Sequence, residues 1–277
     1  MFAGSTAIRA ALAENAVVGL RRVAFGDAVF EARRITRQSH DGACTVSFDY
    51  PVAISIGGHA APAGTNESLR RFGTAFSMHD FFEDRRAAGE DEFAACERDR
   101  RTTTALMKHA KDGMSGALDR ATFTYDAVSS VTYARGGFAS IARDAYYNWS
   151  PSAHPNSARS TLLVDLRSGR TFGYGALIRT NPRSIAALDA LIRVKLRVLD
   201  RGLADAPDRP GRPYGIGPGG RFLPEGYGID VTRAGFHINN LFDIHALAGV
   251  AVDLSRAELT RAGVLRTDGP LRALLGY

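Results

Sequence analysis

The sequence predicts an α+β fold in which an antiparallel sheet packs against a long amphipathic helix, with an N-terminal strand hairpin and helical part. Three observations predict this fold. The hairpin dipeptide Asp41-Gly42 separates two strand-type runs near the N-terminus. More strand-type runs follow between residues 123 and 166. Apolar residues then recur at helical spacing from Ile185 to Leu199.

The N-terminal hairpin is predicted from Val29–Arg37 and Cys44–Ile56. Its turn needs positive φ at both central residues, which Asp-Gly tolerates. Apolar and polar side chains alternate from Thr45 to Tyr50, which predicts one buried face. Pro51 cannot donate a ladder hydrogen bond, so we expect it on an edge or at a bulge.

The helical part is predicted from three stretches. Asn66 is a candidate N-cap for a helix that reaches about Phe81, and a second helix is expected from about Asp91 to Lys111. The Ala-rich stretch Ser5–Asn15 is a shorter candidate. We therefore expect an N-terminal hairpin and helical subdomain over residues 1–120 and a second α+β subdomain over 121–277.

The second subdomain is predicted to be rich in strands. Strands are expected over Phe123–Val131, Thr132–Ala142, Ser160–Leu166 and around Gly249–Leu254, with further short segments at Thr171–Ile178, Gly228–Val231 and Gly235–Asn240. Ser168-Gly169 predicts a tight turn after the third of these strands, and Arg256–Thr260 a short helix.

The clearest helix signal is a set of six apolar residues on one side of a helix: Ile185, Leu188, Leu191, Ile192, Leu196 and Leu199. Asn181-Pro182 suits the beginning of this helix, because proline is tolerated in a first turn. Gly202 suits the residue after its last turn.

Composition limits the class of protein more than its function. The 277 residues are 45% hydrophobic and 23% charged, which is ordinary for a globular chain, and the formal net charge is +6. The excess charge is almost all arginine and forms no compact basic block interleaved with aromatics, so nucleic acid is not expected as a partner. No apolar run reaches the roughly 18–20 residues of a membrane span.

Compartment is left open by the sequence. The N-terminus shows no basic segment followed by an apolar run, so no signal peptide is visible, and a genuine start would indicate the cytoplasm. Cys44 and Cys96 are the only cysteines, compatible with one disulfide or with two buried thiols.

Motifs that carry chemistry are weak. His154 next to Pro155 suits a ligand contact, a general base or a turn held by the imidazole, and Asp165 is expected to be a strand-end turn residue. The ligand types of a metal site are present among Asp230, His237, Asp243 and His245, but their spacing matches no compact zinc pattern, so no metal is predicted. The glycines of Gly215–Gly220 follow a Pro-rich coil and not a strand, so no nucleotide cofactor is predicted.

One aromatic and polar stretch is the candidate ligand-binding region. Aromatic rings can stack on a sugar or fill a protein interface, and histidine and asparagine add hydrogen-bonding groups. The candidate residues are Tyr146, Tyr147, Trp149, His154 and Asn156.

Several motifs in one order resemble a known family. They are Ala153-His154-Pro155-Asn156, then Leu163–Arg170, the helix at Ile185–Leu199, Gly235–Ile238 and Leu241–Gly249. This order resembles the extracytoplasmic domain of RsiV-type anti-sigma factors, which also precedes peptidoglycan deacetylases of the PdaC type and occurs in bacterial lipoproteins. The resemblance implies an exported α+β domain that faces the cell envelope, extracytoplasmic or periplasmic.

The resemblance also implies lysozyme as a partner, because RsiV-type members bind it. The net charge disfavours this partner, since two basic proteins repel each other at low salt.

Three functions therefore stand as hypotheses. The first is a non-enzymatic cell-envelope binding or sensing domain of the RsiV/PdaC-accessory kind, with an envelope protein or a cell-wall polymer as its partner. The second is an envelope hydrolase that uses His154 with Asp165, or the region of His237 and His245. The third is a structural interaction module.

Overall fold

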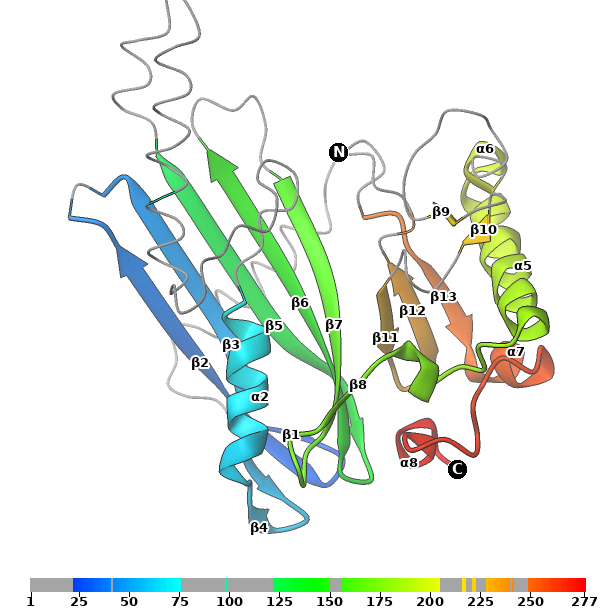
Figure 1. Cartoon of the computed structure of the whole chain (residues 1–277), viewed down its shortest axis with the longest axis horizontal. Helices are drawn as coiled ribbons and strands as arrows, with labels where there is room; N and C mark the ends of the chain where they lie inside the picture. The colour runs from blue at the N-terminus through cyan, green and yellow to red at the C-terminus, as the bar shows by residue number, and fades with distance from the viewer. Residues whose placement is uncertain are drawn as a thin grey trace, which may run out of the picture.

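The computed structural model describes residues 22–40, 42–75, 98, 122–149, 156–204, 216–217, 221–222, 228–239, 241 and 249–277. Within these ranges the chain forms a mixed α+β fold that is mostly sheet, as predicted. A large sheet and a three-stranded sheet lie side by side, with helix α2 over one face of the large sheet and helix α5 beyond the small sheet (Figure 1).

The large sheet has eight strands in the order β1-β2-β3-β5-β6-β7-β8, with β4 paired to β3. Its strands are β1 (Arg22–Phe25), β2 (Ala28–Gln38), β3 (Cys44–Ile56), β4 (His59–Ala60), β5 (Phe123–Arg135), β6 (Phe138–Trp149), β7 (Asn156–Asp165) and β8 (Thr171–Phe172). All pairs are antiparallel except β3 with β5.

The predicted N-terminal hairpin is confirmed as β2 and β3. Gly42 takes φ +68° at the turn, as the Asp-Gly dipeptide requires, while Asp41 lies outside the described residues. Pro51 lies two residues beyond the last β3–β5 pair, Asp49 with Val128, so it sits where β3 has lost its neighbour on that side.

The parallel pair β3–β5 joins the two halves of the chain. It runs from Cys44 with Phe123 to Asp49 with Val128. Strands from both sides of the predicted boundary at residue 120 are therefore hydrogen-bonded neighbours in one sheet. A parallel pair needs a crossover connection, and the long segment between these strands supplies it.

The break between β5 and β6 lies later than the sequence predicted. The predicted boundary between Val131 and Thr132 is wrong, because Thr132 is an extra residue in β5 at which the register shifts. The turn is instead made by Gly136 and Gly137, at φ +62° and +80°. A Gly-Gly pair suits a tight hairpin, since both central residues need positive φ.

The segment after β7 contains less strand than predicted. Gly169 at φ +74° makes the expected turn. Thr171–Ile178 was predicted as one apolar segment, but β8 ends at Phe172 and a 3-10 helix follows at Tyr174–Ala176. Ile178 then makes an isolated bridge to Leu265.

Helix α2 (Ala63–Gly73) covers one face of the large sheet. It begins three residues before Asn66, so the prediction of Asn66 as its N-cap is wrong. The Asn66 amide instead accepts a hydrogen bond from the Ala53 N–H at 2.8 Å and donates to the Ala53 carbonyl at 3.0 Å. These backbone groups lie beyond the β5 pairing, and Asn66 satisfies them as a strand neighbour would. The helix predicted at Ser5–Asn15 lies outside the described residues, and of the helix predicted at Asp91–Lys111 only Arg98, which is helical, is described.

The three-stranded sheet is antiparallel and consists of β11 (Gly228–Val231), β12 (Gly235–Asn239) and β13 (Val252–Ser255). Helix α5 (Pro182–Leu199) covers its far face through a buried row of four residues: Ser184, Leu188, Ile192 and Leu196. The helix therefore packs on the small sheet and not on the large one (Figure 1).

Caps define the ends of the C-terminal helices. The Asn181 side chain accepts from the Ser184 N–H, and Pro182 occupies the first turn of α5. Gly202 was predicted to follow the last turn of this helix, but Asp200 caps α5 and Gly202 lies within α6 (Arg201–Ala204). Ser255 and Glu258 form a capping box on α7 (Arg256–Arg261). The remaining elements are β9 (Ile216–Gly217), β10 (Arg221–Phe222) and α8 (Arg272–Leu275).

Cys44 is buried at the start of β3 and is disulfide-bonded. Cys96 is the only other cysteine in the sequence. In the described part of the chain, no helix combines the length and the apolarity that a membrane crossing requires.

Candidate functional site

The two faces of β6 have different roles. Arg143, Ala145 and Tyr147 point to the face that α2 covers, where Arg143 donates to the carbonyls of Phe72 and Ala75 at 3.0 and 2.6 Å. Because successive strand residues point to opposite faces, Ser140, Asp144 and Tyr146 lie on the other face. That second face meets the small sheet and carries the polar residues described below.

The structure separates the predicted ligand residues. Tyr147 is 3% exposed and stacks on Tyr125 with ring centroids 6.4 Å apart, so its ring belongs to the core. Tyr146 is half-buried on the opposite face, where it pairs across strands with Ser157. The described positions of Trp149 and Asn156 concern the backbone only, and His154 lies outside the described residues.

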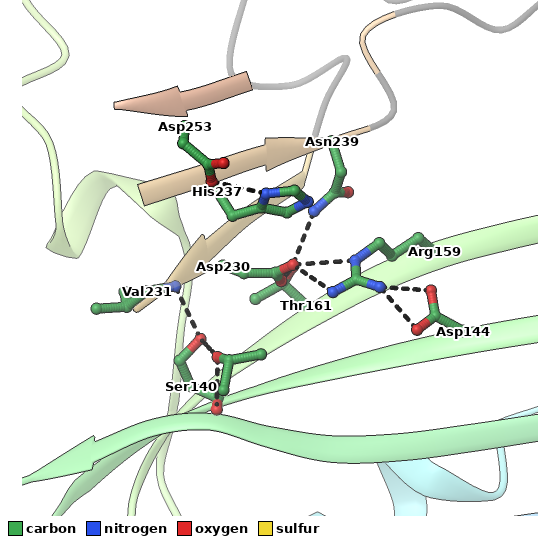
Figure 2. Close-up of polar contacts among 10 residues, drawn as sticks. Ser140, Asp144, Arg159, Thr161, Asp230, Val231, His237, Asn239 and Asp253 are labelled. Carbon is green, nitrogen blue, oxygen red and sulfur yellow. Dashed lines mark hydrogen bonds and ion pairs between the residues drawn. The ribbon is translucent and has the colours of Figure 1, made fainter. Parts of the chain in front are cut away.

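A polar seam joins the large sheet to the small one (Figure 2). We use this name for Asp144, Arg159, Thr161, Asp230 and Asn239. The first three come from β6 and β7, and the last two from β11 and β12. They meet because β11 lies against the outer face of the large sheet.

Asp230 is the centre of the seam and is only 1% exposed. Its Oδ2 accepts hydrogen bonds from Nε and Nη2 of Arg159 at 2.9 and 2.8 Å and from Nδ2 of Asn239 at 2.9 Å. Its Oδ1 accepts from the Thr161 hydroxyl at 2.5 Å. A buried carboxylate is costly unless it is paired and hydrogen-bonded, and here four donors meet that need.

Arg159 links the buried carboxylate to a more exposed one. Its Nη1 lies 2.6 and 2.7 Å from the two carboxylate oxygens of Asp144. Burial lowers the pKa of Arg159, but the charges of Asp230 and Asp144 more than offset it, so the pKa is raised above its usual value. The guanidinium therefore stays charged and holds the two sheets together.

A second contact between the sheets lies one residue further along β11, at Val231. Ser140 Oγ accepts a hydrogen bond from the Val231 N–H at 3.0 Å. The Thr132 hydroxyl, at the extra residue of β5, also bonds Ser140 Oγ, at 2.9 Å. The irregularity in β5 thus helps position the small sheet.

His237 lies in the middle strand of the small sheet, directly opposite Asp230 on one side and Asp253 on the other. Its Nδ1 lies 2.9 Å from Asp253 Oδ1 (Figure 2). The sequence grouped His237 with Asp230, Asp243 and His245 as potential metal ligands. The last two lie outside the described residues, and within the described ones no group of three or more such side chains is arranged to hold a metal.

Asp165 serves the turn after β7, as predicted. Its Oδ1 accepts from the Arg167 N–H and its Oδ2 from the Ser168 hydroxyl, both at 2.8 Å. Both oxygens are therefore engaged in the turn.

Sequence reasoning missed the polar seam. Asp230 and Arg159 are 71 residues apart, and no local pattern pairs them. A weak signal was present, because Asp230 stands among apolar residues in a short strand and such a carboxylate needs a partner. The alternation of Ser157, Arg159 and Thr161 along β7 also indicated a polar face.

Comparison with known proteins supports the fold. No protein-family model and no curated protein matches the sequence. A member of the DUF3298 family from Bacteroides fragilis aligns with a TM-score of 0.55 over 91% of this chain and 98% of its own, at 14% identity. The two proteins share a fold. A DUF3298 family protein from Pseudomonas aeruginosa PAO1 aligns at 12% identity with a TM-score of 0.45, over 90% of this chain and 95% of its own. DUF3298 denotes a domain of unknown function, so the likeness concerns architecture and not activity.

Proposed function

We propose that this protein is a non-enzymatic extracytoplasmic domain that binds or senses a component of the cell envelope, of the RsiV/PdaC-accessory kind. One observation carries the proposal. The buried ionisable groups of the polar seam satisfy one another, with Asp230 held by four donors and Arg159 by two carboxylates. An acid or base needs a free position for substrate, and a carboxylate with four donors offers none. The seam therefore stabilises a surface and does no chemistry.

The disulfide at Cys44 supports a location outside the cytoplasm. Disulfides persist in oxidising compartments and are rare where thioredoxin and glutathione keep thiols reduced.

We place the contact surface on the outer face of β5, β6 and β7 near Tyr146. Asp126, Tyr146 and Ser157 form one cross-strand row there, and Thr124 and Asn148 form the next. All five side chains are at least partly exposed. A tyrosine ring among hydroxyl, amide and carboxylate groups suits a cell-wall glycan or a polar protein surface.

A binding assay with purified peptidoglycan sacculi and solubilised envelope proteins tests this surface. We expect Tyr146→Ala to reduce capture of the envelope component by at least about tenfold, the loss typical of a central contact residue. Tyr277→Ala is the matched control, because Tyr277 is also exposed but lies at the C-terminus. Equal capture by both variants and the unmodified protein would reject this contact surface.

Lysozyme is a disfavoured partner in this proposal. The net charge of +6 opposes association with a basic enzyme, and the opposition should be strongest at low salt. Isothermal titration calorimetry at low and physiological salt is expected to give no binding heat. Saturable heat at either salt concentration would reinstate lysozyme as a partner.

One observation favours a hydrolase as the second candidate. His237 is held by Asp253 through Nδ1, which leaves its other ring nitrogen for a proton transfer. This candidate predicts that isolated peptidoglycan releases soluble fragments in the presence of the protein, and that His237→Ala abolishes the release. No release by the unmodified protein would eliminate it.

A further inference from the structure

Helix α5 is apolar on two opposite sides. The row Ser184, Leu188, Ile192 and Leu196 is buried against the small sheet. The row Ala186, Ala190, Val194 and Val198 is displaced from it by two positions, which is about 200° around a helix. A surface helix with one buried face ordinarily carries polar residues on the other. The second apolar row is therefore unexplained by the fold.

This outer row is exposed to solvent from Ala190 onward, while Ala186 is half-buried. Val194 is 54% exposed and Val198 is 82% exposed, and the neighbouring Leu199 is 61% exposed. Only two other large hydrophobic residues in the described ranges are exposed to a comparable extent, Val23 and Tyr277. Exposed apolar side chains are thus concentrated on the last turns of α5. Clustered apolar exposure of this kind marks interaction sites.

Exposed arginines flank the row, and the exposed carboxylate nearest to it in the sequence is that of the C-cap residue Asp200, which accepts a hydrogen bond from the Gly202 N–H. Arg183 lies three residues before Ala186 and Arg197 lies three residues after Val194, so each is a neighbour of the row on the helix surface. Both arginines are exposed. The carboxylate within α5, Asp189, lies on another side and pairs with Arg193 at 3.1 Å. Lys195 also points away, because it pairs with Glu258 at 2.8 Å. The outer face of α5 therefore presents an apolar stripe with arginines and no acidic side chain of its own helix.

We propose that the outer face of α5 docks an amphipathic helix of a partner protein, whose apolar stripe is flanked by acidic residues. Alanine and valine at four-residue spacing form the low ridge that lets two helix axes approach to about 8–10 Å. Acidic flanks on the partner would pair with Arg183 and Arg197. Helix α5 lies on the far side of the small sheet from β6, the strand that carries Tyr146 (Figure 1), so the proposal is independent of the contact surface on the large sheet.

Two other occupants fit the face less well. A second copy of the chain would bring Arg183 and Arg197 against the same arginines, which repel each other. A membrane surface would suit the positive charge, but interfacial helices insert Trp, Phe or Leu, and the outer row consists of alanine and valine.

The test uses the full chain and two synthetic helical peptides. Both peptides carry leucine at positions i, i+3, i+4 and i+7. One has glutamate at the flanking positions and the other has lysine. Fluorescence anisotropy should show that the acidic peptide binds at least about tenfold more tightly than the basic one. Val194→Gln with Val198→Gln should weaken that binding by at least about tenfold. The control Val23→Gln should not, because Val23 is exposed on β1.

A charge reversal separates loss of the surface from loss of the fold. Arg197→Glu should weaken binding of the acidic peptide and strengthen binding of the basic peptide. An unfolded protein would not show this reversal of preference. Equal binding of the two peptides, no binding of either, or binding unaffected by the valine changes would overturn the proposal. A monomer–dimer equilibrium that Val198→Gln abolishes would assign the face to a second copy instead. Arginine-dependent binding to phosphatidylglycerol vesicles without peptide binding would assign it to the membrane.

Discussion

Replacing Asp230 by alanine should destabilise the protein severely, because it leaves the Arg159 guanidinium without its buried partner. Breaking a buried ion pair from one side typically costs about 3–5 kcal/mol. Arg159 keeps Asp144 and is partly exposed to water, with 23% of its side chain accessible, so the lower end of this range applies. We expect a loss of about 3 kcal/mol in the free energy of unfolding, or roughly 6–12 °C in Tm at about 2–4 °C per kcal/mol.

The assay is urea unfolding of the oxidised protein at neutral pH, followed by far-UV circular dichroism. A companion variant tests the cause, since Asp230→Leu combined with Arg159→Met removes both charges and replaces them with apolar groups of similar size. Such double replacements are often neutral or stabilising, so the pair should recover most of the loss. A loss below about 1 kcal/mol for Asp230→Ala, or no recovery in the double variant, would refute our account of the seam.

Three further changes test other parts of the fold. The hydrogen bond from Lys195, followed by those from Ser255, lowers the pKa of Glu258 to about 2. The folded pKa lies below the usual value of 4.5, so this stabilisation is present above about pH 4.5 and is lost as the pH falls towards 2. Glu258→Gln should flatten the decline in the free energy of unfolding over that window, and an unchanged acid titration would contradict this. Gly169→Ala should lower the free energy of unfolding by more than about 1 kcal/mol, because the residue has a positive φ and an added Cβ would also meet the α2 backbone. Gly57→Ala is the control, because Gly57 also has a positive φ but has open space around it, and it should lower the free energy by less in the same urea assay. Equal losses would show that the contact with α2 is irrelevant. Asn66→Ala should lower the free energy of unfolding by about 1–3 kcal/mol, because it leaves two β3 backbone groups without their partner, and hydrogen exchange at β3 should quicken; unchanged exchange would oppose this role.

The sequence predicted those parts of the fold that local patterns determine. The β2–β3 hairpin follows from Asp41-Gly42 and strand alternation, and the turn after β7 follows from Ser168-Gly169. The Gly136-Gly137 turn follows the same preference for positive φ in hairpin turns. Thr132 is an extra residue that interrupts the alternation of apolar and polar side chains, and the boundary between β5 and β6 was therefore predicted there and not at the glycines.

The missed features all depend on partners that are distant along the chain. Nothing local indicates that β3 pairs with β5 in parallel. The role of Asn66 as a neighbour of β3 also appears only once α2 is packed on the sheet. Two of the candidate ligand residues on β6 face opposite ways. Tyr146 lies on an outer face, but alternation along β6 sends its neighbour Tyr147 into the core.

The β3–β5 pairing also has a consequence during synthesis. Until β5 leaves the ribosome, the first hairpin exposes the long edge of β3 with its unpaired amides and carbonyls. A nascent chain in that state is vulnerable to association with other extended polypeptides. Separately expressed fragments divided near residue 121 should accordingly be poorly soluble alone and should reconstitute the native sheet when refolded together.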